Sequence, residues 1–263
     1  MNAAIGNPLH LPFLTAVFAV SITGFWNIYF GPGATPTAYH HLHVITTLAW
    51  LLLLGLQLIL IRGNQRALHR RIGLSLFIVG PFLIGSLALL SVHSAGRALS
   101  RDEADPLVVQ NIFPAIEVGL FLVFGFLVRK NRKLHGNFLL SSALLFMGIA
   151  LFFTLISFVP GFIVTGPDTF DRFEKAAVTA TGVCAAIGLV LYLSDRKAGW
   201  PWLLATGLFF INALISVLIT EADKTKWLTD RVGVLNELAA FVGAFVIFLA
   251  ALVAAWRRAD RSG

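Results

Sequence analysis

The chain has 263 residues, of which 57% are hydrophobic and 13% are charged, and its mean hydropathy is +0.83. Soluble domains carry roughly a quarter charged residues, so this composition excludes an ordinary water-soluble fold. The formal net charge of +7 does not indicate a nucleic-acid partner, because the basic residues are divided among short loops between apolar runs. The composition therefore predicts an integral membrane protein.

Several uncharged runs are long enough to cross a bilayer, which takes about 20 residues of helix. They are too uniformly apolar to show the alternation of barrel strands, so we predict helices, whose backbone groups pair internally in lipid. Eight spans are predicted, over residues 9–30, 42–61, 72–94, 106–128, 136–158, 174–194, 200–220 and 233–256. The intervening loops are short, which predicts an all-α, polytopic transmembrane helical bundle that forms a single domain over residues 1–263.

The first two spans carry different signals. The segment Met1–Leu9 has no basic region and no small-residue cleavage site follows, so we expect a retained helix and not a signal peptide. In the second span, His43, Trp50 and Gln57 are spaced by seven residues, which keeps them close to one helix face. Polar and aromatic groups on one face are expected to point into the bundle and not towards lipid.

Histidines gather near the two predicted membrane surfaces. At the outer surface, His40 and His43 share a helix face, and His93 closes the third span on the same side. These three imidazoles form a candidate transition-metal site, or they supply axial ligands to a haem b. At the inner surface, His69 opens the third span and His135 opens the fifth, which makes them a second candidate ligand pair.

Two haems buried in the bundle fit this arrangement poorly. His69 opens the third span and His93 closes it, so the two residues lie about 36 Å apart along a helix at 1.5 Å per residue. That distance spans the whole hydrocarbon core, so both sites would lie at the surfaces. One site, or two interfacial metal sites, fits the spacing better.

Glu117 lies near the middle of the fourth span. No Lys or Arg falls in the middle of any span, and desolvation penalises the charged form of a carboxyl, so we expect Glu117 to be protonated at neutral pH. It is a candidate proton carrier or ligand to a bound cation. Asn212 and Trp50 are predicted at similar depth, and a neutral carboxyl hydrogen-bonded to Asn212 is the purely structural alternative. Pro114, just before Glu117, is expected to bend the helix.

Charge asymmetry orients the bundle. On one predicted side lie 13 of the 20 Lys and Arg residues, whereas the other side carries seven of them together with nine of the 13 acids. By the positive-inside rule, this asymmetry places both termini in the cytoplasm of a multi-pass inner-membrane protein. The basic loops are expected to contact anionic headgroups of the lipid bilayer.

Several helix-start motifs occur together over residues 26–140. They are Phe30-Gly31-Pro32, His41-Leu42-His43, Ala49-Trp50 with Gln57, Leu68-His69-Arg70-Arg71-Ile72-Gly73 and Lys133-Leu134-His135. This combination resembles a broad family of bacterial polytopic membrane proteins without an assigned activity, and residues 170–258 resemble it less specifically. The resemblance implies an inner-membrane protein in which His43, His69 and His135 are important. Helix-end histidines are also similar to those of transmembrane b-type cytochromes.

Three function classes remain open from the sequence. The leading hypothesis is a redox or metal- or haem-binding membrane protein in which Glu117 handles a coupled proton. The alternatives are a proton-coupled small-solute transporter and a non-enzymatic assembly or scaffold subunit, with a membrane-complex partner or as a homo-oligomer. Phosphate-loop, zinc-protease, CxxCH and GxSxG motifs are absent from the sequence, which makes ATP-driven and covalent-cofactor chemistry unexpected. Whether the chain is an enzyme stays open.

Overall fold

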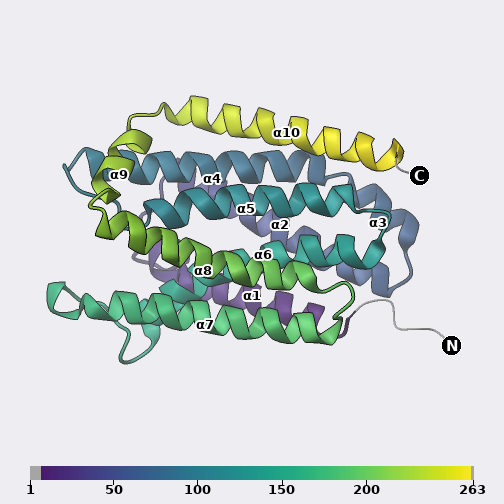
Figure 1. Cartoon of the computed structure of the whole chain (residues 1–263), viewed down its shortest axis with the longest axis horizontal. Helices are drawn as coiled ribbons and strands as arrows, with labels where there is room; N and C mark the ends of the chain where they lie inside the picture. The colour runs from purple at the N-terminus through teal and green to yellow at the C-terminus, as the bar shows by residue number, and fades with distance from the viewer. Residues whose placement is uncertain (1–6, 262–263) are drawn as a thin grey trace.

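The computed structural model describes residues 7–261, so most of the segment predicted to precede the first helix lies outside the described part of the chain. Over residues 7–261 the chain is helical and contains no β-strand. The helices pack side by side as a bundle, and α1 begins at the end of the bundle where α10 finishes (Figure 1). We call this the inner end and the opposite one the outer end. The predicted all-α bundle is confirmed.

Within this range, seven helices are long and apolar enough to cross a membrane. They are α2 (Ala38–Arg62), α4 (Leu76–Leu99), α5 (Val108–Leu127), α6 (Arg132–Phe158), α7 (Asp171–Ser194), α8 (Trp200–Glu221) and α10 (Glu237–Arg261). A shorter apolar helix, α1 (His10–Gly24), is followed by a π-helical stretch, η1 (Trp26–Phe30), and together they cover the first predicted span. The remaining elements are α3 (Arg66–Gly73), α9 (Thr225–Gly233) and the short 3₁₀ turn η2 (Pro167–Thr169).

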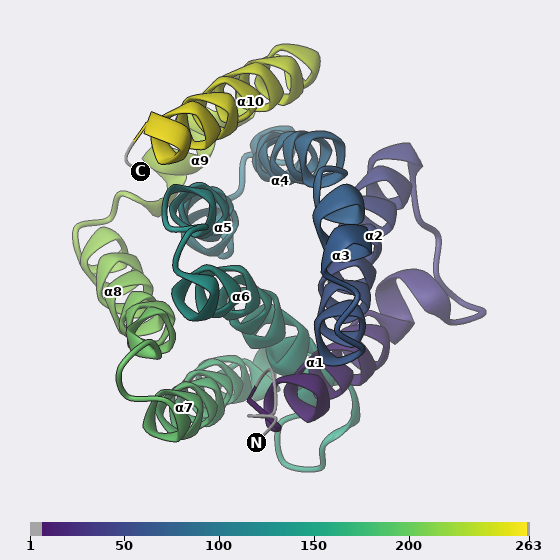
Figure 2. The ribbon, with the colours of Figure 1, turned by 90° about the vertical axis from the view of Figure 1, so that its right-hand side faces the viewer.

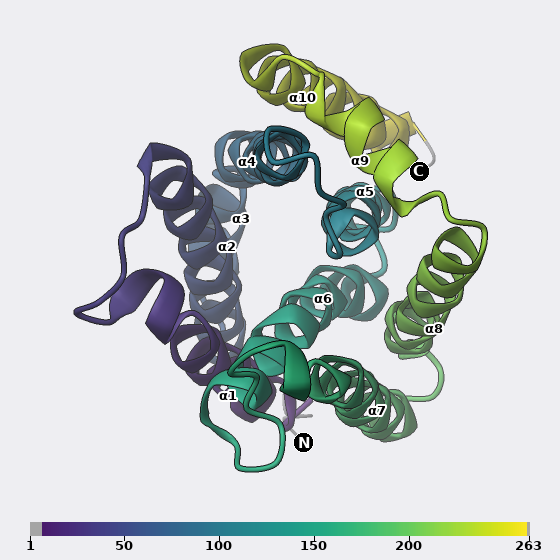
Figure 3. The same cartoon turned by 90° about the vertical axis from the view of Figure 1, so that its left-hand side faces the viewer.

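The helix α6 is the most enclosed of these spans. It packs against α1, α5, α7 and α8, and end-on views show it among them (Figures 2 and 3). The helices α8 and α10 lie at the periphery and expose large apolar side chains, among them Phe210, Leu214, Val246 and Ile247. A soluble protein rarely leaves such continuous apolar surface uncovered, so these faces contact lipid and the chain is a multi-pass membrane protein.

Small residues allow the closest helix contacts. A side chain at Gly24 of α1 would overlap the Ala150 carbonyl oxygen of α6 and lie 3.0 Å from Thr154 Oγ1. Gly188 of α7 also allows a close helix contact, because a Cβ at this position would overlap Thr206 Oγ1 of α8. Close backbone approach at small residues is typical of helix interfaces in membranes, and it fixes how α1 and α7 pack.

The prediction that His69 opens a membrane-spanning helix is wrong. His69 lies in the separate short helix α3, and the spanning helix α4 begins only at Leu76. The cause is charge, because Arg66, Arg70 and Arg71 on α3 are costly to place in hydrocarbon and stay at the inner end. The distance of about 36 Å between His69 and His93 assumed one continuous helix, so it does not apply to this structure.

Candidate functional site

Glu117 is buried in the middle of α5, with 6% of its surface exposed. The side chain of Asn212 on α8, itself 7% exposed, lies close enough to interact with the Glu117 carboxyl. Glu117 Oε2 and Asn212 Oδ1 are nevertheless both covered and have no hydrogen-bond partner. In the described part of the chain no ion pair involves Glu117. Oxygen atoms that are covered from solvent normally accept a hydrogen bond. Protonation of the Glu117 carboxyl would provide an O–H donor for this site.

A pocket of about 290 Å³ lies at the outer end of the same helix pair. Its hydroxyl-bearing lining residues are Ser216, Thr220 and Thr225, and its other lining residues are Ala104, Pro106, Val108 and Val109. Ser216 is one helical turn from Asn212, about 6 Å along α8, and Val109 is about 12 Å from Glu117 along α5. Gln110 lies next to Val109, and its Oε1 is covered without a partner. Polar groups therefore follow the contact between α5 and α8 from the outer pocket to Glu117.

At the inner end, His135 is oriented by a backbone carbonyl. Its Nδ1 donates to the carbonyl oxygen of Gly125, the residue two turns beyond Glu117 on α5, at 2.7 Å. The helix that carries His135 starts one turn earlier, where the Asn131 side chain accepts a hydrogen bond from Leu134 N. With the proton on Nδ1, the neutral ring keeps an unprotonated Nε2.

His69 has the opposite tautomer. The orientation of the Gln57 amide is assigned from its neighbours: with its nitrogen donating to the His69 carbonyl at 3.1 Å and its oxygen accepting from Gly73 N–H at 3.2 Å, both ends of the amide are paired. The same nitrogen contacts His69 Nδ1, which must then accept, and the neutral ring carries its proton on Nε2. His69 and His135 are close enough for their charges to interact. The two rings thus have opposite tautomers, with Nε2 protonated on His69 and unprotonated on His135.

Burial lowers the pKa of His69 below its usual value, and a hydrogen bond to the backbone of Gln57 partly opposes this shift. The folded state therefore favours the neutral ring. The neutral His69 ring contributes fully to the free energy of unfolding when the pH is above its pKa in the unfolded chain, about 6.5. This contribution is lost as the pH falls from about 6.5 through the lowered pKa of the folded state. We expect the melting temperature of the wild type to fall more between pH 7.5 and 5.5 than that of the His69→Gln variant. A His41→Gln variant, altered at an exposed ring, should keep the wild-type pH dependence, and an equal fall in all three proteins would contradict the prediction.

The outer histidines are held by different neighbours. His93 Nδ1 donates to Glu237 Oε1 at 2.7 Å, and Tyr39 stacks on the ring at a centroid distance of 3.6 Å. His93 Nε2 is covered and has no partner. His40 Nδ1 accepts from Thr37 N–H at 3.1 Å as part of the capping box that starts α2. His40 therefore carries its proton on Nε2 and serves the helix start.

The contacts of His43 differ from those of His93 and His40. Its Nδ1 lies 3.4 Å from Ser86 Oγ on α4, and that hydroxyl also bonds Thr46 Oγ1 at 2.8 Å. Over residues 7–261, no group of three or more His, Cys, Asp or Glu side chains is arranged to hold a metal ion. The structure therefore places His40, His43 and His93 in one region of the outer end without gathering them as a ligand set.

The polar stripe of α2 faces the bundle, as predicted. Trp50 is 1% exposed and its Nε1 donates to Ser142 Oγ of α6 at 3.1 Å. His43 contacts α4 and Gln57 contacts α3. The stripe thus joins α2 to three different helices, and Trp50 does not contact Glu117 as a polar partner.

Asn137 is a buried polar residue that sequence reasoning missed. Its Nδ2 donates to the Ala198 carbonyl at 2.8 Å, and its Oδ1 accepts from Trp202 Nε1 at 3.3 Å. These bonds tie the start of α6 to the start of α8. The available signal was an amide near the start of a predicted apolar span, two residues after His135.

No family model, curated protein or solved structure matches the chain in comparisons with known proteins. The resemblance to a bacterial membrane protein family stays a prediction from the sequence.

Proposed function

We propose that the chain is a proton-coupled transporter of a small polar solute, in which Glu117 binds and releases the proton. The observation that carries the proposal is the Glu117–Asn212 pair in the middle of the bundle, where two covered oxygens lack donors and no ion pair is made. A carboxyl at membrane depth is costly to ionise. A bound proton removes the charge of Glu117 and gives its carboxyl an O–H group that can donate a hydrogen bond. The protonated and ionised forms of this site therefore differ strongly in free energy.

The outer pocket supports the coupling to a solute. Its volume of about 290 Å³ suits a small molecule, and Ser216, Thr220 and Thr225 offer hydroxyls that both donate and accept hydrogen bonds. Gln110 lies between this pocket and Glu117 along α5, with its carbonyl oxygen free to accept. A solute in the pocket and a proton on Glu117 would occupy neighbouring positions along α5 and α8.

The inner histidines supply a second group that handles protons. Gly125, which holds His135, lies about 12 Å from Glu117 along α5. In these tautomers the Nε2–H of His69 is a hydrogen-bond donor and the Nε2 of His135 is an acceptor. Histidine is the side chain whose ordinary pKa lies closest to neutral pH, so these rings can take up and release protons there. Glu117 in the middle of α5 and His135, which is bonded to the inner part of the same helix, therefore provide proton-binding groups at two depths of the bundle, with His69 of α3 close enough to interact with His135.

Purified protein reconstituted into liposomes with an internal pH-sensitive dye tests the proposal. With a pH gradient imposed and the membrane potential clamped by potassium and valinomycin, we expect proton entry that rises when small polar solutes are added outside. Protein-free liposomes give the background leak. Proton entry that stays at this background across amino acids, small organic acids and sugars would reject the proposal.

A bound haem or transition metal is the second candidate, with Glu117 as the group for a coupled proton. It is favoured by His93 and His135, whose Nδ1 atoms donate to a carboxylate and a carbonyl respectively. Metal-ligating histidines are usually oriented in this way, with Nε2 left as the ligand atom. His40 and His69 fit less well, because hydrogen bonds to Nδ1 leave their proton on Nε2.

An optical spectrum and a metal analysis of the purified protein decide this second candidate. If haem is bound, we expect a Soret band that is lost in His135→Ala or His93→Ala and kept in His41→Ala, because His41 is exposed and pairs with Tyr29. A protein with no Soret band and no stoichiometric metal eliminates the redox hypothesis.

A further inference from the structure

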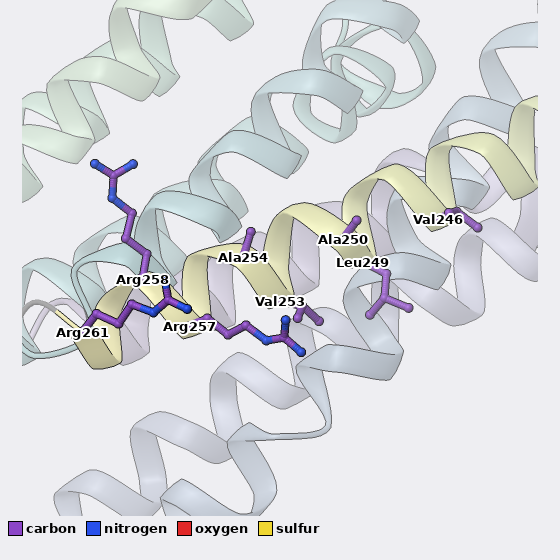
Figure 4. Close-up of a pocket in the computed structure, with 8 residues that line it drawn as sticks. All are labelled: Val246, Leu249, Ala250, Val253, Ala254, Arg257, Arg258 and Arg261. Carbon is purple, nitrogen blue, oxygen red and sulfur yellow. The ribbon is translucent and has the colours of Figure 1, made fainter.

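A groove of about 800 Å³ follows one face of α10 (Figure 4). The residues that line it are Val246, Leu249, Ala250, Val253, Ala254, Arg257, Arg258 and Arg261. Their spacing of three and four residues places them along one side of the helix. From Val246 to Ala254 the lining is apolar over about 12 Å, which is less than half of a hydrocarbon core about 30 Å thick. The apolar part of the groove therefore fits within one leaflet.

Three arginines close the groove at the inner end. Arg257, Arg258 and Arg261 are exposed, and among residues 7–261 no carboxylate forms an ion pair with any of them. The neighbouring acid Asp260 is already paired with Arg129. In Figure 4, Arg257 and Arg261 extend along the side of the helix that carries Val253, whereas Arg258 points away from them. A cluster of unpaired guanidinium groups is well suited to a phosphate, which it can bind through two parallel hydrogen bonds.

We infer that the α10 groove binds one anionic phospholipid of the inner leaflet. Arg257 and Arg261 would hold the phosphate, with Arg258 adding positive charge. An acyl chain would lie against Leu249 and Val253, over the small side chains of Ala250 and Ala254. The charged and apolar parts of the groove match those of a phospholipid in position. The arginines lie at the level of the headgroups, and the apolar lining begins one helical turn deeper.

A second copy of the chain fits this face less well. Small residues such as Ala250 and Ala254 do favour helix pairing in membranes. However, two copies inserted in the same orientation would pair through parallel α10 helices, and a symmetric contact would set each arginine cluster against the other one. Like charges that face each other across an interface are strongly unfavourable. An anionic lipid neutralises the cluster that a second copy would repel.

Native mass spectrometry of the detergent-purified chain, titrated with phosphatidylglycerol or phosphatidylcholine, tests the inference. We expect phosphatidylglycerol to bind at least about tenfold more tightly, since each arginine near a membrane surface contributes roughly fivefold. The triple variant R257Q/R258Q/R261Q should lose this preference. The matched control R66Q/R70Q/R71Q removes the same charge from α3 at the same end of the bundle and should keep it.

A second variant separates the groove from general surface charge. A250F/A254F fills the floor of the groove and leaves all three arginines in place. We expect it to weaken phosphatidylglycerol binding at least about fivefold, which is the loss if the displaced lipid can no longer reach one of the arginines. Both positions face outwards from the bundle, so the variant should still purify as the wild type does. Equal binding of the two lipids, an equal loss in the α3 control, unchanged binding by A250F/A254F, or a dimer that forms through this face without lipid would each overturn the inference.

Discussion

Replacing Glu117 with glutamine is expected to reduce proton entry into proteoliposomes by at least about 100-fold, the lower range of what a positioned proton-transfer group contributes. Glutamine has the same shape and can still hydrogen-bond to Asn212. It cannot bind and release a proton at neutral pH. The substitution therefore removes the chemistry of the site while keeping its volume and its hydrogen bond, and the measurement is the rate of internal acidification under an imposed gradient.

The control for this experiment is Glu174→Gln, the same change at an exposed position on α7. It should leave proton entry at the wild-type rate. The thermal stability of Glu117→Gln should equal or exceed that of the wild type, because a neutral amide avoids any cost of a buried charge. If proton entry through Glu117→Gln matches that of the wild type, Glu117 is not the proton-binding group and the transporter proposal fails.

The spanning helices could be predicted from the sequence because bilayer thickness sets a minimum length that few soluble helices meet with uniformly apolar residues. The short helix α3 could not be separated from α4 in this way. Arg66, Arg70 and Arg71 precede the predicted span over residues 72–94, and hydropathy does not show whether charged residues before a span form a loop, a separate helix or the first turn of the span itself. These three arginines lie at the membrane surface, and their charge is the feature that indicates a separate helix before α4.

The candidate site was only partly predictable. Glu117 and Asn212 could be paired because each is a lone polar group at similar depth, so partners are scarce. The tautomers of His69 and His135 depend instead on the carbonyl of Gly125 and on backbone groups that fix Gln57. Every residue carries such backbone groups, so the sequence gives no sign of which one will meet a ring nitrogen. For the same reason, the sequence did not predict that the outer histidines are held by separate neighbours.

Gly24→Ala is expected to cause the largest loss of stability among single substitutions in the α1–α6 contact. The added methyl group would overlap the Ala150 carbonyl oxygen, lie 2.9 Å from the carbonyl carbon and lie 3.0 Å from Thr154 Oγ1. Overpacking of a tight interior usually costs about 1–3 kcal/mol. Here the obstacle is backbone, which cannot rotate away as a side chain can, so we expect a loss at or above the top of that range in thermal unfolding or SDS titration.

Gly182→Ala on α7 is the matched control, because a Cβ at that position meets no atom within 4 Å. Alanine is the better helix former by about 1 kcal/mol, so this variant should be as stable as the wild type or slightly more stable. Opposite signs for one chemical change would show that the close approach of α1 to α6 determines the effect, and not the helix propensity of glycine. Equal stability of the two variants would mean that α1 does not pack on α6 as closely as Gly24 and Ala150 require.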